Sequence, residues 1–367
     1  MEPEIDTLLR KTSQLGASDL HLGTGETPVV RIGGELTAFP GFSTLFHEGH
    51  EGESSQQPEH AVTGRNVGFA VAETQGQFHA KTVASLSLFD PILPAKQKNL
   101  LKQNGECDFA YELHSGQRFR INLYHSGGNL SAAIRIIPQR IPTCQELGLP
   151  RSAQKLSGLK SGLVLVTGAT GSGKSTTLAA IINEINQTRS AHILTLEDPV
   201  EYKFLPAKSL IHQREVGNDT ISFASGLRAA LREDPDVIMV GELRDLETIA
   251  VAVTAAETGH LVFATLHTRS AVETVNRMVD VFPDQQQRQI RIQLAGSLQA
   301  VISQQLLPAA RGGRVAAFEV MVVTSALRNL IREGKTQQMD SYIQTGAQYG
   351  MQTMNDAIAR LKREGLV

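Results

Sequence analysis

The segment Gly162–Thr177 reads GLVLVTGATGSGKSTT. Within it, residues 168–175 match the phosphate-loop pattern G-x-x-x-x-G-K-[ST], between an apolar strand-like run and a helix-forming run. Glycines let such a loop turn its backbone N–H groups toward phosphate oxygens, and the following helix presents its N-terminus to the same anion. Lys174 is expected to reach the β- and γ-phosphates of ATP, and Ser175 to place its hydroxyl on Mg²⁺. The expected nucleotide-binding residues are Gly168, Ala169, Thr170, Gly171, Ser172, Gly173, Lys174, Ser175 and Thr176.

An acidic residue follows a second apolar run in DPDVIMVGELRD, residues 234–245. Glu242 stands at the end of that run, and Arg244 follows it closely. An acid at such a strand end can hold the shell of Mg²⁺ or polarise the attacking water. We therefore expect Glu242 to hold the Mg²⁺ shell, and we include Arg244 among the residues of the nucleotide site.

A third apolar run leads into TLEDPVEY, residues 195–202, with the acids Glu197, Asp198 and Glu201. Three carboxylates at one strand end are costly to place together unless a cation is near. The alternative is a solvated acidic turn. We expect Glu201 to be the general base, although its role and that of Glu242 could be exchanged.

Two histidines flank the apolar run of GHLVFATLHT, residues 259–268. A histidine at the far end of a parallel strand can hydrogen-bond a γ-phosphate and respond to its loss. His267 is the candidate for this role, and His260 is its counterpart at the near end.

From Gly158 onward, apolar strands alternate with amphipathic helices, which predicts an α/β domain with a largely parallel sheet. The strands are expected at 163–167, 193–196, 237–240 and 261–266, and the helices near Ser175, Phe223, Leu246 and Ala271. The part after about Asp284 is expected to be mostly helical. There, Ile290, Leu294, Leu298, Val301 and Ile302 have helical spacing, which favours one long amphipathic helix.

The residues before this domain have a different pattern. A short helix is expected in 3–15, followed by strands at 19–22, 28–32 and 35–39, and by two more at 117–124 and 130–137. A polar, glycine-rich stretch predicts an irregular insertion near 42–95. The predicted domains are thus residues 1–137, a proline-containing linker at 138–150, and residues 151–367.

Composition argues against several functional classes. The formal net charge is −2, which argues against a dedicated nucleic-acid binder. Two isolated cysteines, Cys107 and Cys144, cannot assemble a cysteine zinc site. Neither a signal peptide nor an apolar run of membrane-spanning length is recognised, so we expect a cytoplasmic protein whose membrane contact is peripheral.

The motifs described above, in this order and spacing, resemble the Walker A, Asp box, Walker B and His box of the secretion ATPase superfamily. This superfamily includes type II and type IV secretion ATPases and the motors of type IV pili. The chain looks most like the PilT-type retraction ATPases, because GASDLHL (16–22), RFRIN (118–122), AIRIIP (133–138) and ALRNLIREGK (326–335) resemble their segments. The similarity extends over nearly the whole chain except residues 42–95. Pilus-extension relatives carry a four-cysteine zinc module, for which this chain has too few cysteines.

The resemblance implies a homo-hexameric ring whose subunits have a PAS-like N-terminal α/β domain and a RecA-like P-loop ATPase domain with a helical C-terminal part. Nucleotide would bind between the domains, where Arg118, Arg120 and Arg135 would reach the phosphates. Arg328 and Asn329 would belong to a retraction-specific surface, for which a plain solvated helix is the alternative.

Hydrolysis would change the angle between the domains and act on a platform protein at the inner membrane. The implied output is pilus retraction and twitching motility, with a second retraction ATPase as a further partner.

Three other functions compete with this interpretation. The chain could be a type II or type IV secretion or pilus-assembly motor, which neighbouring genes would reveal. It could translocate nucleic acid, which filter binding would test. It could be a ring component that binds ATP without hydrolysing it, which phosphate release would exclude.

Overall fold

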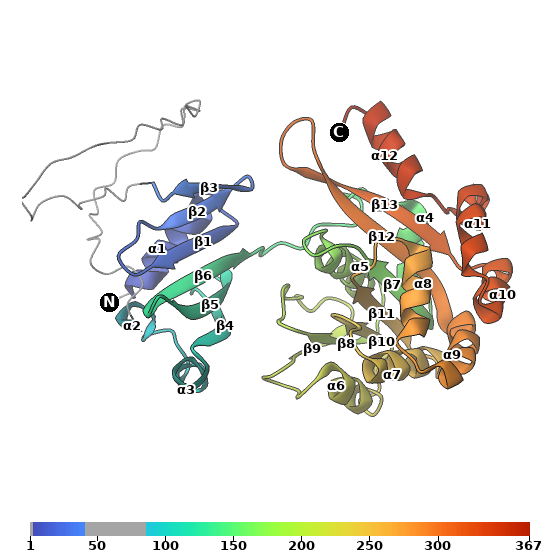
Figure 1. Ribbon diagram of the computed structural model, residues 1–367, viewed down its shortest axis with the longest axis horizontal. Coiled ribbons are helices and arrows are strands. Elements are labelled where there is room, and N and C mark those ends of the chain that lie inside the picture. Colours follow the sequence, from blue (N-terminus) through green and yellow to red (C-terminus); the bar gives the residue numbers. More distant parts are fainter. Residues whose placement is uncertain (1–2, 41–85) are drawn as a thin grey trace, which may run out of the picture. The chain divides into compact units, whose positions relative to one another are not determined.

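The computed structural model describes residues 3–40 and 86–367. The chain divides into two compact units, Met1–Ile137 and Pro138–Val367, each with its own sheet and core (Figure 1). The mixed α/β class expected from the sequence is confirmed. Most of the expected insertion near 42–95 lies outside the described residues.

The first unit contains an antiparallel sheet in the order β3-β2-β1-β6-β5-β4. Along β5, Phe119, Ile121 and Leu123 are fully buried, and the residues between them are only partly buried. This alternation gives the sheet one apolar and one polar face. The strands are β1 (Asp19–Gly23), β2 (Val29–Ile32), β3 (Glu35–Ala38), β4 (Glu106–Glu112), β5 (Arg118–Ser126) and β6 (Asn129–Ile137).

Helices contribute to the core on the apolar face of this sheet. The helix α1 (Glu4–Gln14) buries Ile5, Leu8 and Leu9 there. The helices α2 (Leu86–Phe89) and α3 (Ala95–Asn104) precede β4. The prediction of irregular structure is wrong for residues 86–89, because they form a helix whose Phe89 is fully buried in the core.

The second unit contains a sheet in the order β13-β12-β7-β11-β10-β8-β9. All neighbouring pairs are parallel except β12 with β13. Every residue of β7, β10 and β11 is buried, which explains their unbroken apolar runs. The strands are β7 (Gly162–Thr167), β8 (His192–Glu197), β9 (Leu210–Glu215), β10 (Val237–Val240), β11 (Leu261–Leu266), β12 (Leu298–Pro308) and β13 (Arg314–Val322).

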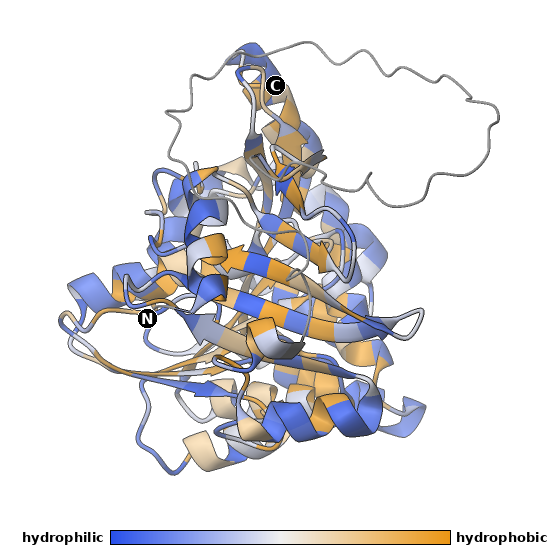
Figure 2. Ribbon diagram, turned by 90° about the vertical axis from the view of Figure 1, so that its left-hand side faces the viewer, coloured by the Kyte–Doolittle hydropathy of each residue, from blue (hydrophilic) through white to orange (hydrophobic). Residues whose placement is uncertain are grey.

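Helices cover both faces of the parallel sheet, and alternate residues of β7, β8, β10 and β11 enter one of two cores. The helices α4 and α5 share one core, and α6 to α11 share the other. Figure 2 shows helices of the chain banded in hydrophilic and hydrophobic colours, as amphipathic helices are. The helices are α4 (Arg151–Gln154), α5 (Lys174–Thr188), α6 (Phe223–Ala230), α7 (Leu246–Glu257), α8 (Ala271–Asp280), α9 (Asp284–Ser297), α10 (Ser325–Glu333), α11 (Met339–Thr345) and α12 (Met354–Arg363), with the 3₁₀ turns η2 (Lys155–Gly158), η3 (Thr336–Gln338) and η4 (Ala347–Tyr349).

The predicted helix starts near 175, 223, 246 and 271 are confirmed, whereas the long amphipathic helix after Asp284 is wrong. Helix α9 ends at Ser297, and the chain enters β12 at the next residue. Pairing of β12 with β7 buries Val301 and Ile302 completely. Short apolar runs fit a buried strand as well as a helix, and this pairing with a strand far away in sequence decided between them.

Among the residues that the structure describes, no helix is long and apolar enough to cross a lipid bilayer.

A buried acid joins two helices in the second unit. Glu319 on β13 accepts hydrogen bonds from the backbone N–H of Ala271, at 2.8 Å, and of Met354, at 3.4 Å. These are the first residues of α8 and α12, whose initial N–H groups have no partner within the helix. Burial raises the pKa of Glu319 above its ordinary value of 4.5.

The raised pKa of Glu319 predicts a pH dependence of stability. The folded protein holds this proton more tightly than the unfolded chain does, so its contribution is complete below pH 4.5 and is lost as the pH rises through the folded pKa. We expect the free energy of unfolding of the wild type to fall relative to that of Glu319→Gln as the pH rises above 4.5. Urea denaturation at stepped pH measures this, with the exposed Glu364→Gln as control. Parallel curves for wild type and Glu319→Gln would contradict it.

Candidate nucleotide-binding site

The loop between β7 and α5 has the backbone that its glycines predict. The φ angles of Gly168, Gly171 and Gly173 are 148°, 76° and 87°, values that side-chain-bearing residues rarely adopt. A Cβ at Gly168 would lie 2.4 Å from the backbone oxygen of Gln304. The sequence therefore needs glycine at this position for close packing as well as for the turn.

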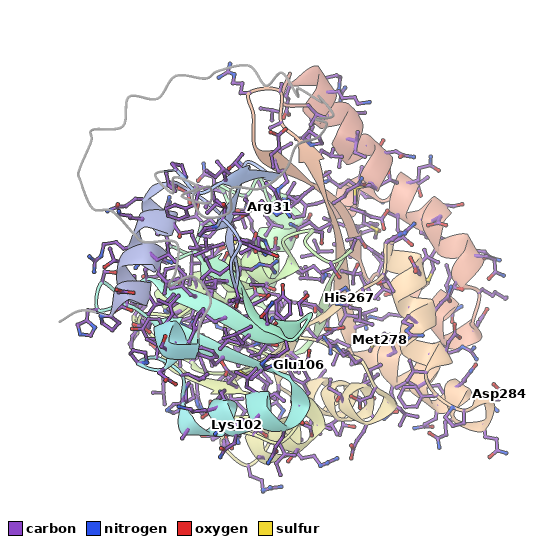
Figure 3. The ribbon with its side chains drawn as sticks, turned by 60° about the vertical axis from the view of Figure 1, so that its left-hand side comes forward. Arg31, Lys102, Glu106, His267, Met278 and Asp284 are labelled. Carbon is purple, nitrogen blue, oxygen red and sulfur yellow. The ribbon has the colours of Figure 1, made fainter. Side chains whose placement is uncertain are left out.

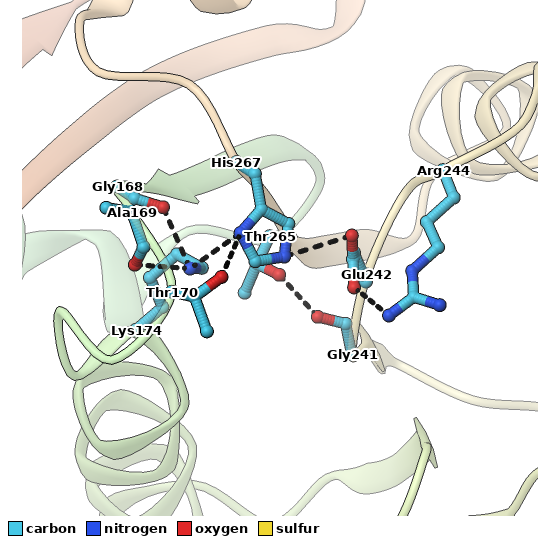
Figure 4. A network of polar contacts seen from close by, with 9 residues as sticks. All are labelled: Gly168, Ala169, Thr170, Lys174, Gly241, Glu242, Arg244, Thr265 and His267. Atoms are coloured by element: carbon cyan, nitrogen blue, oxygen red, sulfur yellow. Dashed lines mark hydrogen bonds and ion pairs between the residues drawn. The ribbon is translucent and has the colours of Figure 1, made fainter.

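Lys174 lies inside this loop. Its Nζ donates to the carbonyl oxygens of Gly168, at 2.8 Å, and Ala169, at 3.0 Å, and lies 3.4 Å from Nδ1 of His267 (Figure 4). Burial lowers the pKa of Lys174, while the carboxylates of Glu242 and Glu201 act in the opposite direction. The loop thus holds one cation at the place where a phosphate is expected.

His267 connects Lys174 to Glu242. Its Nε2 lies 3.0 Å from one carboxylate oxygen of Glu242, and the second oxygen lies 2.7 Å from Arg244. An ammonium group can only donate, so Nδ1 of His267 accepts, and the N–H of Nε2 donates a hydrogen bond to the Glu242 carboxylate. Burial acts to raise the pKa of Glu242, but its contacts with Arg244 and His267 hold the pKa below the ordinary value.

The carboxyl ends of β7, β11 and β10 place these residues together, since the three strands are parallel neighbours. His267 directly follows β11 and precedes α8, which carries the buried Met278 (Figure 3). Glu242 follows β10 in the same way. The structure thus brings Lys174, Glu242, Arg244 and His267 into one contact network.

The acids of residues 195–202 divide into one buried and two exposed side chains. Glu197 is 6% exposed and accepts from Thr195 Oγ1, at 2.6 Å, and Gln213 Nε2, at 3.0 Å. It also accepts from the backbone N–H of Glu201, at 3.4 Å, and burial raises its pKa. Asp198 and Glu201 are exposed. Glu197 therefore organises the turn that carries Glu201.

His260 is not brought to this network. It precedes the amino end of β11, whereas His267 follows the carboxyl end. Its Nδ1 lies 3.0 Å from the carbonyl oxygen of Ala255 in α7. The position of His260 fits a role at the end of that helix.

The three candidate arginines lie on β5 and β6 in the first unit. Arg120 and Arg135 are direct cross-strand neighbours, and they pair with Asp108, at 3.4 Å, and Asp19, at 2.9 Å. Arg118 lies 4.0 Å from Glu112. The contact of these arginines with phosphates stays a prediction.

Arg328 and Asn329 differ in their surroundings. The Arg328 guanidinium donates to the carbonyl oxygens of Ala295, at 2.6 Å, and Gly296, at 2.9 Å, near the end of α9. Asn329 is exposed and contacts Glu333 on its own helix, at 2.9 Å. Arg328 thus caps the end of α9, whereas the side chain of Asn329 is exposed and could contact a partner.

Sequence reasoning missed Gln304, which packs against the phosphate loop from β12. A pair of glutamines within an apolar run was the only available signal, and the predicted helix concealed its meaning. Sequence reasoning also missed Tyr202 as a partner of the phosphate loop. Its hydroxyl lies 2.9 Å from that of Thr176.

The side chains of this site fit magnesium and a nucleotide. Among the described residues, no cluster of three or more histidine, cysteine or acidic side chains could bind a metal by itself. Mg²⁺ commonly takes one or two protein groups together with phosphate oxygens, and Ser175 and Glu242 can supply these. The hydroxyl of Ser172 is buried in the loop and lacks a partner among the described residues. An incoming phosphate could provide one.

The capping contacts of Arg328 yield a stability prediction. Arg328→Ala removes these hydrogen bonds and leaves the carbonyls at the end of α9 without them, which should lower the free energy of unfolding by about 2 kcal/mol. The exposed Arg332→Ala on the same helix is the matched control and should change it by less than about 0.5 kcal/mol. Chemical denaturation measures both variants. Equal free energies of unfolding for Arg328→Ala and Arg332→Ala would show that the contacts of Arg328 with the end of α9 contribute nothing to stability.

Comparison with known proteins adds independent information. A family model described as "Type II/IV secretion system protein" matches residues 118–365. The chain is 44% identical to the Pseudomonas aeruginosa protein "Type IV pilus retractation ATPase PilT" over 364 residues, which are 99% of this chain and 95% of that protein. It is 53% identical to the "Twitching motility protein" of Neisseria gonorrhoeae over 277 residues, 75% of this chain and 74% of that one.

A solved structure described as the pilus retraction motor PilT with bound ADP has a TM-score of 0.83 and 45% identity, and the match covers 100% of this chain and 95% of that one. The resemblance recognised in the sequence motifs is therefore confirmed along the length of the chain. The chain belongs to the type II/IV secretion system protein family and, within it, to the PilT-type pilus retraction ATPases.

Proposed function

We propose that the chain is a motor that hydrolyses Mg·ATP at the loop of residues 168–176 to drive retraction of type IV pili. The observation that carries the chemistry is the contact chain from Lys174 through His267 to Glu242. It joins a phosphate loop, a candidate sensor and a candidate metal-binding acid at one edge of a parallel sheet. A phosphate loop beside an acidic strand end is typical of phosphoryl transfer by P-loop ATPases.

Each residue then has a definite task. Lys174 leaves the loop carbonyls and turns toward the β- and γ-phosphates. Ser175 and Glu242 hold the metal shell, where Mg²⁺ supplies charge neutralisation. Glu201 is the general base, since it is exposed at the same sheet edge and its charge acts on Lys174. His267 responds to the loss of the γ-phosphate through its contact with Glu242.

The catalytic ring would be a homo-hexamer. Arg118, Arg120 and Arg135 would complete the charge cage at the phosphates and stabilise the charge of the transition state. Carboxylates in the first unit pair with these guanidinium groups and can hold them in place until a nucleotide binds. A platform protein at the inner membrane is the proposed mechanical partner.

Retraction is favoured over a secretion output because the relatives named for pilus retraction and twitching motility match this chain over most of their length. Neighbouring genes that encode pilins would support this output. Genes for secretion subunits would favour the alternative.

The catalytic assignment predicts the effect of removing either acid. Glu201→Gln and Glu242→Gln keep the side-chain size but remove the charge, and each should lower kcat for ATP by about 100-fold or more. Phosphate release from purified protein measures this. The exposed Glu247→Gln, from an acid paired with Arg228 on the surface, is the control that should retain turnover. Near-normal turnover in both test variants would refute the site.

The surface position of Asn329 yields a prediction on coupling. Asn329→Ala removes an exposed amide and leaves the hydrogen bonds of Arg328 to the end of α9 unchanged. ATP turnover should therefore stay within about twofold of wild type, while twitching is lost. Twitching zones of a deletion strain carrying each variant measure this, with the exposed Ser325→Ala as control. Normal twitching of the Asn329 variant would remove this residue from the retraction surface.

A further inference from the structure

Gln304 on β12 uses both ends of its amide to hold the phosphate loop. The side chain is 5% exposed, and its Nε2 donates to the carbonyl oxygen of Ser172 at 2.7 Å. Its Oε1 accepts from the hydroxyl of Thr177, also at 2.7 Å. The carbonyl oxygen can only accept, so this orientation of the amide is the one that satisfies both contacts.

The backbone around Gln304 fits the same loop closely. A Cβ at Gly168 would lie 2.4 Å from the backbone oxygen of Gln304, and one at Gly173 would lie 2.9 Å from its Nε2. Gln304 therefore packs against both the first and the last glycine of the loop. It is preceded by Ser303, whose hydroxyl lies 3.0 Å from that of Thr167 at the end of β7.

These contacts form where β12 runs beside β7. The loop leaves β7 at Gly168, and Thr177 lies in the first turn of α5. Gln304 thus bridges the last part of the loop and the helix from a neighbouring strand. A glycine-rich loop has much conformational freedom to lose, and ordering it during binding costs affinity.

We infer that Gln304 is a positioning residue that holds the phosphate loop in its binding shape before nucleotide arrives. This inference rests on the proposed function, since it assigns the loop to nucleotide. Gln304 acts through Ser172 and Thr177. Its loss should therefore weaken nucleotide binding more than it slows turnover at saturation.

The neighbouring Gln305 provides a matched control. It is the same residue type on the same strand, but its side chain is exposed. Gln304→Met keeps much of the side-chain volume and removes both hydrogen bonds, whereas Gln305→Met changes only the surface. A difference between the two variants therefore reports the contacts with the loop.

The experiment measures the affinity of each protein for fluorescent ADP, and KM and kcat for ATP. It also measures hydrogen–deuterium exchange of residues 168–177 without nucleotide. Gln304→Met should lose affinity by about tenfold, equivalent to about 1.4 kcal/mol. It should raise KM more than it lowers kcat and speed exchange in the loop. Gln305→Met should match wild type in all three measurements.

A second variant keeps the test decisive if Gln304→Met does not fold. Thr177→Val preserves the side-chain shape and removes the hydroxyl that Gln304 accepts from. It should shift affinity and loop exchange in the same direction. If both variants fold, the double variant should lose less binding free energy for ADP than the sum of the two single losses, because both substitutions disturb the same contact.

The outcomes separate this inference from the proposed function. Wild-type protein that binds no ADP would overturn the function itself. Wild-type protein that binds ADP, with unchanged affinity and loop exchange in Gln304→Met and Thr177→Val, would overturn the positioning role. A lower melting temperature in Gln304→Met with wild-type affinity would also overturn it, because Gln304 would then serve only the core.

Discussion

The parallel alignment of β7, β11, β10 and β8 is the constraint on which the rest of the second unit depends. Parallel strands end at one edge, so segments separated by many residues meet there without any long loop. The phosphate loop follows β7, His267 follows β11 and Glu242 follows β10. Burial of the strands on both faces leaves this edge as the place where their polar side chains can gather.

Electrostatic balance then shapes the site. Lys174 is buried, and the cost of burying its charge is offset by the carbonyl oxygens of Gly168 and Ala169 and by the charges of Glu242 and Glu201. Glu242 is balanced in turn by Arg244 and His267. A phosphate that draws Lys174 away would change the surroundings of His267 and Glu242 at once. Under the proposed function, the same contacts would bind the nucleotide and respond to its hydrolysis.

The motifs of the ATPase domain were predictable because their chemistry is local. A glycine at positive φ, an apolar strand and a helix start each leave a mark within a few residues, as in residues 162–177. Contacts made by residues distant in sequence leave no such mark. The end of α9 at Ser297, the capping by Arg328 and the amide contacts of Gln304 all depend on strands or helices far along the chain. The pattern of residues 284–302 therefore predicted the wrong element.

The sequence by itself determined the phosphate loop, the positions of four apolar strands along the chain and the membership in the retraction ATPases, because these rest on residue types at short, fixed spacings. Only the tertiary structure decided which polar residues meet. It joined His267 to Lys174 and Glu242 and paired His260 with the carbonyl oxygen of Ala255. It turned Glu197 inward while leaving Glu201 exposed. The physical reason is that hydrogen-bond partners are chosen by strand order and packing, which no local pattern encodes.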